Sequence, residues 1–215
     1  MKFVIVDTKN AKKGFSLIEV AIAIVVIGLV VGLSLKGKEL IHTAKLNSIV
    51  DQVNAFRMAA QMFTDKYSAI PGDFNNAKEM IDSSLENGAG ISSITSVSDA
   101  KRFWKHLVAS GLLSVELING FPVSKIGGYF SVSTNVGGYE GTWVILSKGT
   151  SNNTSFSGII SQEDAYIIDK KYDNGVPSSG EIRTLRVSGS NLVSIGQKYD
   201  LKSKKSDCII MFRLW

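Results

Sequence analysis

The sequence has little of the chemistry on which most enzymes and metal proteins depend. Its 215 residues include one cysteine, Cys208, and two histidines, His42 and His106. A single cysteine excludes an intramolecular disulfide, and no histidine and cysteine pairs occur at zinc-ligand spacing. His106 lies among apolar neighbours and is interpreted as a packed core residue, and Cys208 as a small buried hydrophobic residue of a strand. We therefore predict no catalytic residues and no cofactor.

Charge is almost absent from residues 15–35, where Glu19 is the only ionisable side chain. As a helix, these 21 residues would extend roughly 31 Å, which just crosses the hydrocarbon core of a bilayer. Residues 1–14 precede them with four lysines and one aspartate. Basic residues beside an apolar segment hold that end in the cytoplasm. The pattern predicts a single membrane helix with the rest of the chain on the opposite side.

The position of this apolar run distinguishes it from an ordinary secretory signal, which is cleaved after the run at an A-x-A-like site. Here the run is followed by Lys36-Gly37-Lys38-Glu39. Cleavage between Gly14 and Phe15 would instead remove only the leader and keep the helix. The segment Lys12-Lys13-Gly14-Phe15-Ser16-Leu17-Ile18-Glu19, with the apolar tail behind it, resembles the prepilin cleavage and methylation signature of type IV pilins and type II secretion pseudopilins.

The resemblance assigns a role to each of these positions. It implies that a prepilin peptidase cuts after Gly14 and methylates the new amino group of Phe15. A carboxylate in lipid is costly and requires a partner. In the family, the acid that matches Glu19 meets the N-terminal amine of a neighbouring subunit. The alternative, that Glu19 snorkels to the headgroups, stays open. The pair Gly28 and Gly32 has the small-xxx-small spacing that lets another membrane helix approach.

Net charge and cysteine content limit which classes of partner are expected. The formal charge of +5 falls to +2 without the leader, whose four lysines and one aspartate carry +3, so nucleic acid is not expected as the main partner. Many major pilins close a C-terminal loop with two cysteines, whereas Cys208 is alone, which favours a pseudopilin over a major or minor type IV pilin. The expected partners are prepilin peptidase, other pilin or pseudopilin subunits, the filament assembly machinery and the bacterial inner membrane.

Beyond the membrane segment, an apolar stripe at alternating spacings of three and four predicts that the helix continues to about Ser68, where Ile70-Pro71-Gly72 ends it. The stripe consists of Leu46, Ile49, Val53, Phe56, Ala60, Phe63 and Tyr67. Further on, the period changes to two, and residues 129–133, 142–146, 183–187, 191–195 and 208–212 read as strands. The predicted fold is α+β and pilin-like, with a long N-terminal helix packed on an antiparallel sheet.

The domain organisation follows from these segments. We expect a leader at residues 1–14, a membrane or filament-core half of the helix at 15–35, an amphipathic half at 36–69 and a periplasmic globular domain at 70–215. Within that domain, Ser98 is expected to cap a helix that runs to Ser110. Ser161, with Asp164 three residues on, is expected to cap another that runs to Tyr172.

Two alternatives remain open. Asp169, Asp173 and Glu181 could supply oxygens to a calcium ion, although their spacing is not that of an EF-hand and a solvated face is the simpler interpretation. A membrane-anchored periplasmic binding or enzymatic domain could carry the same leader, but the sequence displays no convergent polar groups for it. The favoured interpretation is a subunit of a type IV pilus-like filament or type II secretion pseudopilus.

Overall fold

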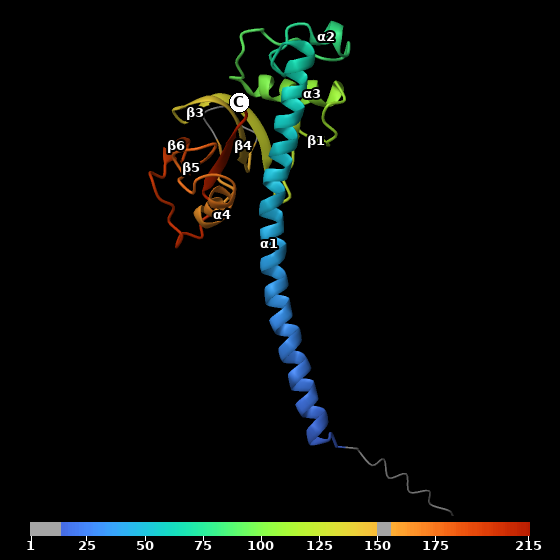
Figure 1. Cartoon of the computed structure of the whole chain (residues 1–215), viewed down its shortest axis with the longest axis vertical. Coiled ribbons are helices and arrows are strands. Elements are labelled where there is room, and N and C mark those ends of the chain that lie inside the picture. The colour runs from blue at the N-terminus through green and yellow to red at the C-terminus, as the bar shows by residue number, and fades with distance from the viewer. Residues whose placement is uncertain (1–13, 150–155) are drawn as a thin grey trace, which may run out of the picture. The chain divides into compact units, whose positions relative to one another are not determined.

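The computed structural model describes residues 14–149 and 156–215 (Figure 1). The leader therefore lies outside the described residues up to Lys13. The chain divides into two compact units, of which the first ends at Thr43 and the second comprises Ala44–Trp215.

The long helix α1 covers Leu17–Tyr67 and so belongs to both units. Its 51 residues confirm the prediction of one helix that continues past the apolar run. The helix ends where the sequence predicted. Ser68 adopts a left-handed φ of 50°, Pro71 follows, and Gly72 has a φ of 82°. A proline cannot continue a helix, and a glycine tolerates a positive φ, so this segment turns the chain away.

The predicted stripe is the buried face of α1 in the second unit. Its first six members are fully buried, and Tyr67 is half-buried. Phe56 lies at the centre, in edge-to-face contact with Trp104 at 4.8 Å and with Phe130 at 5.1 Å between ring centroids. The helix face is therefore covered by a helix and a strand together.

Along the chain, three short elements and one longer helix follow α1 and precede the strands of the main sheet. They are α2 at Ala77–Met80, α3 at Val97–Ala109, β1 at Leu117–Ile118 and β2 at Phe121–Pro122. The expected N-cap Ser98 is wrong by two residues. The cap is Ser96, which accepts from the Asp99 N–H, and the Asp99 carboxylate accepts from the Ser96 N–H in return. This complete capping box satisfies two backbone donors and outcompetes a start at Ser98.

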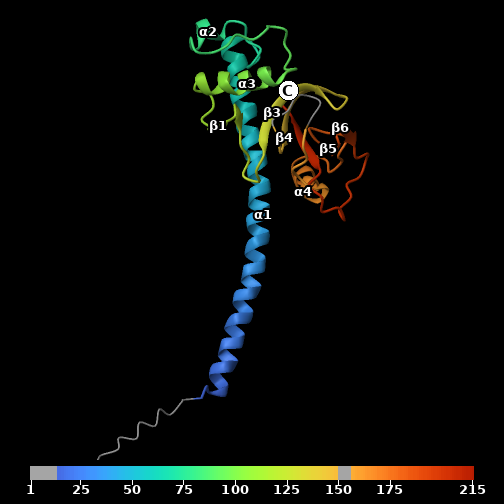
Figure 2. The same cartoon turned by 180° about the vertical axis from the view of Figure 1, so that it is seen from behind.

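The main sheet contains five antiparallel strands in the order β3-β4-β7-β5-β6. The strands are β3 at Tyr129–Val136, β4 at Tyr139–Ser147, β5 at Ile182–Ser188, β6 at Asn191–Ser194 and β7 at Cys208–Arg213. All five predicted strands are present, and the α+β fold class is confirmed. The C-terminal strand β7 lies in the middle of the sheet. Its residues from Cys208 to Phe212 are buried on both faces, so neither face of this strand is polar. Figure 2 shows the same sheet from behind.

Both faces of the sheet are covered. On one face, side chains such as Val144, Ile210 and Phe212 pack with α1, α3 and α4 in the larger core. On the other face, Trp143, Ile145 and Met211 form a smaller core. Strand alternation explains the division, because successive residues point to opposite faces.

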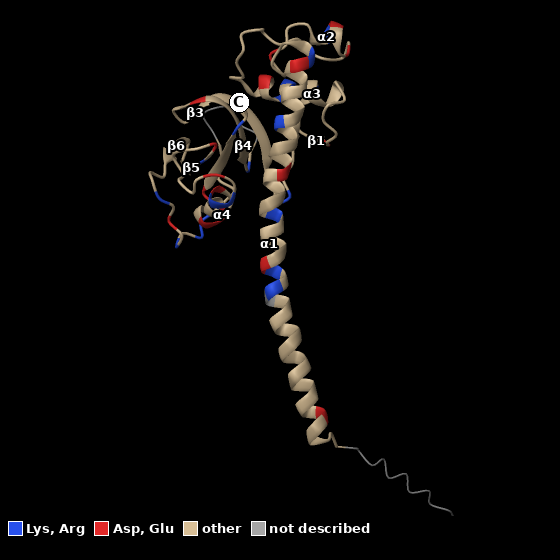
Figure 3. Ribbon diagram, viewed as in Figure 1, with Lys and Arg blue, Asp and Glu red and all other residues tan. Residues whose placement is uncertain are grey.

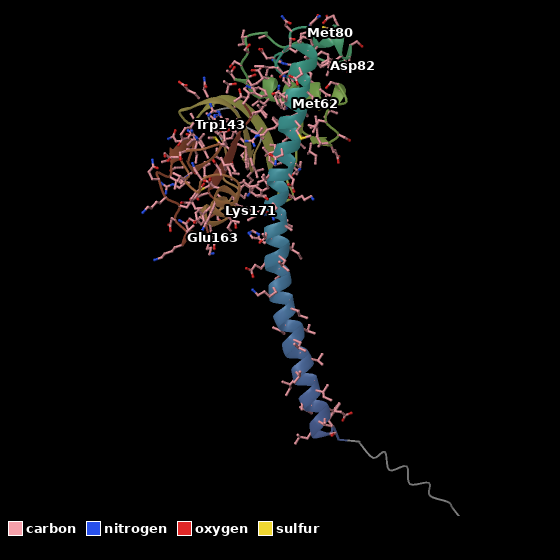
Figure 4. All side chains as sticks on the ribbon, in the orientation of Figure 1. Met62, Met80, Asp82, Trp143, Glu163 and Lys171 are labelled. Carbon is pink, nitrogen blue, oxygen red and sulfur yellow. The ribbon has the colours of Figure 1, made fainter. Side chains whose placement is uncertain are left out.

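The last helix, α4, covers Gln162–Tyr172. Its N-cap is Ser161, which accepts from the Asp164 N–H at 3.1 Å, as the sequence predicted. Near its end, the ammonium of Lys171, labelled in Figure 4, donates to the side chain of Asn47 on α1 at 2.9 Å. Helix α4 therefore contacts the same half of α1 as the sheet does.

Candidate processing and assembly site

The start of α1 is set by a local capping interaction. Gly14, Phe15 and Ser16 precede the helix and are exposed. The Glu19 carboxylate accepts from the Ser16 N–H at 2.9 Å, and Ser16 Oγ accepts from the Ile18 N–H at 3.4 Å. Each bond satisfies a backbone donor that the first turn of a helix leaves without an intrahelical partner.

Glu19 therefore has a partner within its own chain. The sequence carried this signal, because Ser16 followed by Glu19 three residues later is the capping-box pattern. This local contact is neither the neighbouring amine nor the headgroups that the sequence led us to expect for the acid. A carboxylate near the N-terminus of a helix also faces the positive end of the helix dipole.

The residues around the predicted cleavage point are open to approach. Phe15 is one of the most exposed large apolar side chains of the described chain, and a Cβ added at Gly14 would meet no atom within 4 Å. The same holds for Gly28 and Gly32, the small-xxx-small pair. The helix surface directly beside these two glycines is therefore open.

The apolar run itself is bare. Between Leu17 and Leu33, twelve large apolar side chains are exposed by 47–88%. Figure 3 shows this half of α1 as a stretch without charged residues beyond its first turn. By length and composition, α1 is the one described helix that could cross a membrane. Leaving such a stripe in water is unfavourable, so it requires lipid or other protein around it.

His106 is a structural residue. It is fully buried, its Nδ1 accepts from the Gly72 N–H at 3.0 Å, and its Nε2 lies 3.0 Å from the Glu86 carbonyl oxygen, to which it donates in the matching tautomer. Burial lowers the pKa of His106, and the charge of Arg102 lowers it further, against the raising effect of the Glu86 carbonyl. The neutral ring thereby holds the loop after α1 against α3. The sequence predicted His106 as a packed core residue, and the structure agrees.

Asp169 is also engaged within the fold. It is fully buried, and its carboxylate accepts from Tyr199 Oη at 2.7 Å and from the Gly175 N–H at 2.8 Å. Burial raises the pKa of Asp169 and that of the Tyr199 hydroxyl, which also contacts Thr184 at 2.9 Å. This network fastens the loop after β6 to α4 and β5.

The calcium candidates do not form a ligand cluster. Asp173 accepts from the Ile182 N–H at 2.8 Å, and Glu181 faces Arg213 at 3.9 Å rather than the two aspartates. Within residues 14–149 and 156–215, no three acidic, histidine or cysteine side chains gather where a metal ion could bind. Cys208 is buried and free, and burial raises its thiol pKa to about 12, so this sulfur stays protonated.

Two surface hollows bear on the alternative of a binding or enzymatic domain. One, of about 460 Å³, lies at the end of α3 and contains Glu116 as its ionisable group. The other, of about 180 Å³, contains Asp73, whose carboxylate accepts from the backbone N–H groups of Gly90 and Ser92. Neither hollow brings an acid, a base and a nucleophile together.

The comparisons with known proteins concern the N-terminus and the overall fold. A protein-family model described as "Prokaryotic N-terminal methylation motif" matches residues 9–35. A similar solved structure is that of the major type IV pilin PilA1 from Clostridium difficile, with 14% identity, a TM-score of 0.41, and coverage of 81% of this chain and 96% of that one. No curated protein gives a significant sequence match. The motif recognised from Gly14 to Glu19 is confirmed: residues 9–35 carry a prokaryotic N-terminal methylation motif.

Proposed function

We propose that this chain is a structural subunit of a type IV pilus-like filament or type II secretion pseudopilus, held in the inner membrane and polymerised through α1. One observation carries the proposal. The methylation motif over residues 9–35 includes the first part of α1, where twelve large apolar side chains are left exposed by the described residues.

The energy of that exposed half supports a role in assembly. Burying a valine, leucine or isoleucine side chain contributes roughly 1.5–3 kcal/mol, so twelve such residues represent roughly 18–36 kcal/mol. Lipid supplies this burial in the membrane, and neighbouring helices supply it in a filament. Transfer of the helix from lipid to the filament changes the buried apolar area little. The preference for the filament therefore depends on close helix packing at Gly28 and Gly32 and on the interactions of the Glu19 carboxylate.

Processing requires that a peptidase reach the bond between Gly14 and Phe15. Both residues precede α1, and a scissile bond outside a helix can be extended in an active site without unwinding a turn. Cleavage there removes the basic leader and leaves a new amine at Phe15. That amine lies one residue before the Ser16 N–H to which Glu19 is hydrogen-bonded.

Glu19 has two roles in this proposal. Within the subunit it caps α1 through Ser16, and during assembly its charge attracts the N-terminal amine of a neighbour. The cap uses one carboxylate oxygen, Oε2, and a carboxylate has about four acceptor positions, so the second contact does not require the first to break.

The remaining assignments follow from the sequence. The leader is cytoplasmic, the apolar half of the helix at residues 15–35 passes once through the inner membrane, and the globular domain at residues 70–215 is periplasmic. The partners are prepilin peptidase, other subunits and the assembly machinery, and the role is mechanical rather than catalytic. A pseudopilin is favoured over a minor type IV pilin because Cys208 has no cysteine partner in the sequence.

The test replaces the native copy with Glu19→Ala, Glu19→Gln or Ser16→Ala and measures the mature mass, the membrane fraction and the filament fraction. Glu19→Gln keeps the capping oxygen but not the charge, and Ser16→Ala removes one cap but keeps the charge. We expect all three to insert, and only the two Glu19 variants to lose incorporation into filaments. Normal filament yield from both Glu19 variants would contradict the charge mechanism. A parent chain found only as unprocessed protein would contradict the proposed function itself.

A further inference from the structure

The chain contains three Asn-Gly dipeptides, at residues 87–88, 119–120 and 174–175. In such a pair, the backbone nitrogen of the glycine can attack the side-chain carbonyl carbon of the asparagine. Glycine hinders this attack least because it has no Cβ. All three pairs are therefore chemically competent in an unfolded chain, and the fold decides which of them can react in the native protein.

The fold protects Asn87. Its Oδ1 accepts from the Lys78 N–H at 2.8 Å, and its Nδ2 donates to the Glu79 carboxylate at 3.2 Å. The Gly88 N–H donates to the Phe74 carbonyl at 2.7 Å. Both reacting groups are thus held in hydrogen bonds, which must break before the nitrogen can reach the side chain.

The fold protects Asn174 in the same way. Its Oδ1 accepts from the Val176 N–H at 2.8 Å, and its Nδ2 donates to Ser179 Oγ at 3.0 Å. The Gly175 N–H donates to the carboxylate of the fully buried Asp169 at 2.8 Å. A hydrogen bond to a buried carboxylate is costly to lose, so this nitrogen is the most firmly held of the three.

Asn119 differs from both. It forms, with Gly120, the two-residue loop of the β1–β2 hairpin, in which Ile118 pairs with Phe121. Its side chain is exposed, and both loop residues have positive φ, 56° and 88°, as in a type I′ turn. Within the described part of the chain, neither the Asn119 side chain nor the Gly120 N–H has a hydrogen-bond partner.

A cation lies close to this loop. A Cβ added at Gly120 would lie 3.0 Å from Lys101 Cγ, so the lysine side chain runs across the glycine, and its ammonium lies 5.9 Å from the centroid of the Phe121 ring. A nearby positive charge favours the negative charge that develops on the Gly120 nitrogen and on the attacked side-chain oxygen.

We propose that Asn119 is a site of spontaneous deamidation in the native protein, and that the fold protects Asn87 and Asn174. The Gly120 nitrogen loses its proton and bonds to Cγ of Asn119. The bond between Cγ and Nδ2 breaks, and Nδ2 leaves as ammonia. Water then opens the cyclic imide at one of its two carbonyls, which gives aspartate or isoaspartate. No oxidant, reductant or enzyme is required.

The product changes the hairpin in two ways. Each event replaces a neutral amide by a carboxylate beside Lys101, which lowers the formal charge of the chain by one. The isoaspartate product also adds one methylene to the backbone of a two-residue loop, whose length and twist fix the pairing of Ile118 with Phe121. The modification therefore marks the age of a subunit at one defined surface position.

The test incubates the full chain in detergent at mildly alkaline pH, and peptide mass spectrometry then follows the mass gain at each asparagine. Parallel samples contain urea, and an isoaspartate methyltransferase assay identifies the isomer. In the native protein we expect Asn119 to react about tenfold faster than Asn87 and Asn174, because reaction there needs no local opening. In urea the three rates should converge.

The Asn119→Gln variant is the control, and it should lose the fast native phase while its other two sites are unchanged. Comparable native rates at all three sites would overturn the proposal. An Asn119 that stays fastest in urea would also overturn it, since the selectivity would then come from local sequence and not from the fold.

Discussion

Phe56 offers the sharpest test of how α1 is attached to its domain. The side chain is 1% exposed and lies between the rings of Trp104 on α3 and Phe130 on β3. Truncation of a buried phenylalanine to alanine typically costs about 3–5 kcal/mol, and each aromatic pair contributes about 0.5–1.5 kcal/mol beyond its buried area. For Phe56→Ala we expect a loss of about 4 kcal/mol, because the two pairs place it in the upper half of that range.

A loss of this size is a large part of the 5–15 kcal/mol that stabilises a typical domain. For a unit of this length, 1 kcal/mol corresponds to roughly 2–4 °C in Tm, so the midpoint should fall by about 10 °C. The assay is thermal and urea unfolding, followed by circular dichroism, of the protein produced without residues 1–35. Phe56→Asp should prevent folding altogether, because it buries an unpaired charge.

Met58 provides a matched control on the same helix. It is 65% exposed, so Met58→Ala should change the free energy of unfolding by no more than about 0.5 kcal/mol. If Phe56→Ala unfolds cooperatively at the midpoint of the parent while Met58→Ala does not, the stripe would be assigned to the wrong face of α1.

Three further predictions concern other parts of the chain. Gly14→Lys should leave the leader attached and the precursor in the membrane, and an intact mass that shows a normal mature N-terminus would contradict cleavage at this bond. Gly88→Ala should abolish folding of the domain, because its Cβ would lie 2.2 Å from the backbone carbon of Asp73; wild-type stability would show that this loop is displaced in solution. Burial holds the pKa of His106 below its ordinary 6.5, so the imidazole binds a proton more readily in the unfolded chain than in the folded one. The stability that this residue contributes is therefore present above pH 6.5 and is lost as the pH falls from 6.5 through the lower pKa of the folded state. The fall in Tm on acidification should therefore be smaller in His106→Gln than in the parent, and equal pH dependence would show that His106 is not the titrating group.

The N-terminal methylation motif, the long helix and the strands could be predicted from sequence because each depends on local order along the chain. The methylation motif depends on neighbouring residue types around Gly14, and the stripe from Leu46 to Tyr67 has a period that only a helix places on one face. The five strands alternate with a period of two between glycine turns, which is also a local pattern.

Other elements differ from the expectation although they carry a local signal in the sequence. Asn119-Gly120 is the strongest short-range hairpin signal, yet β1 and β2 were not predicted, since they are only two residues long. The cap of α3 was placed at Ser98, although Ser96 with Asp99 three residues later fits a capping box. In the same way, the capping contact between Ser16 and Glu19 follows a pattern that is visible in the sequence.

Only the tertiary structure decided which polar groups are held within the fold and which remain free. Asp169 and Asp173 are near in sequence and resemble cation ligands, but folding brings Gly175, Tyr199 and Ile182 to their oxygens. The three Asn-Gly dipeptides are the same in sequence, and they differ in the structure because the Phe74 carbonyl and the Asp169 carboxylate hold two of the three glycine N–H groups. Local patterns fix secondary structure because their causes lie within a few residues, whereas satisfying a buried donor or acceptor depends on partners that the chain supplies from far away.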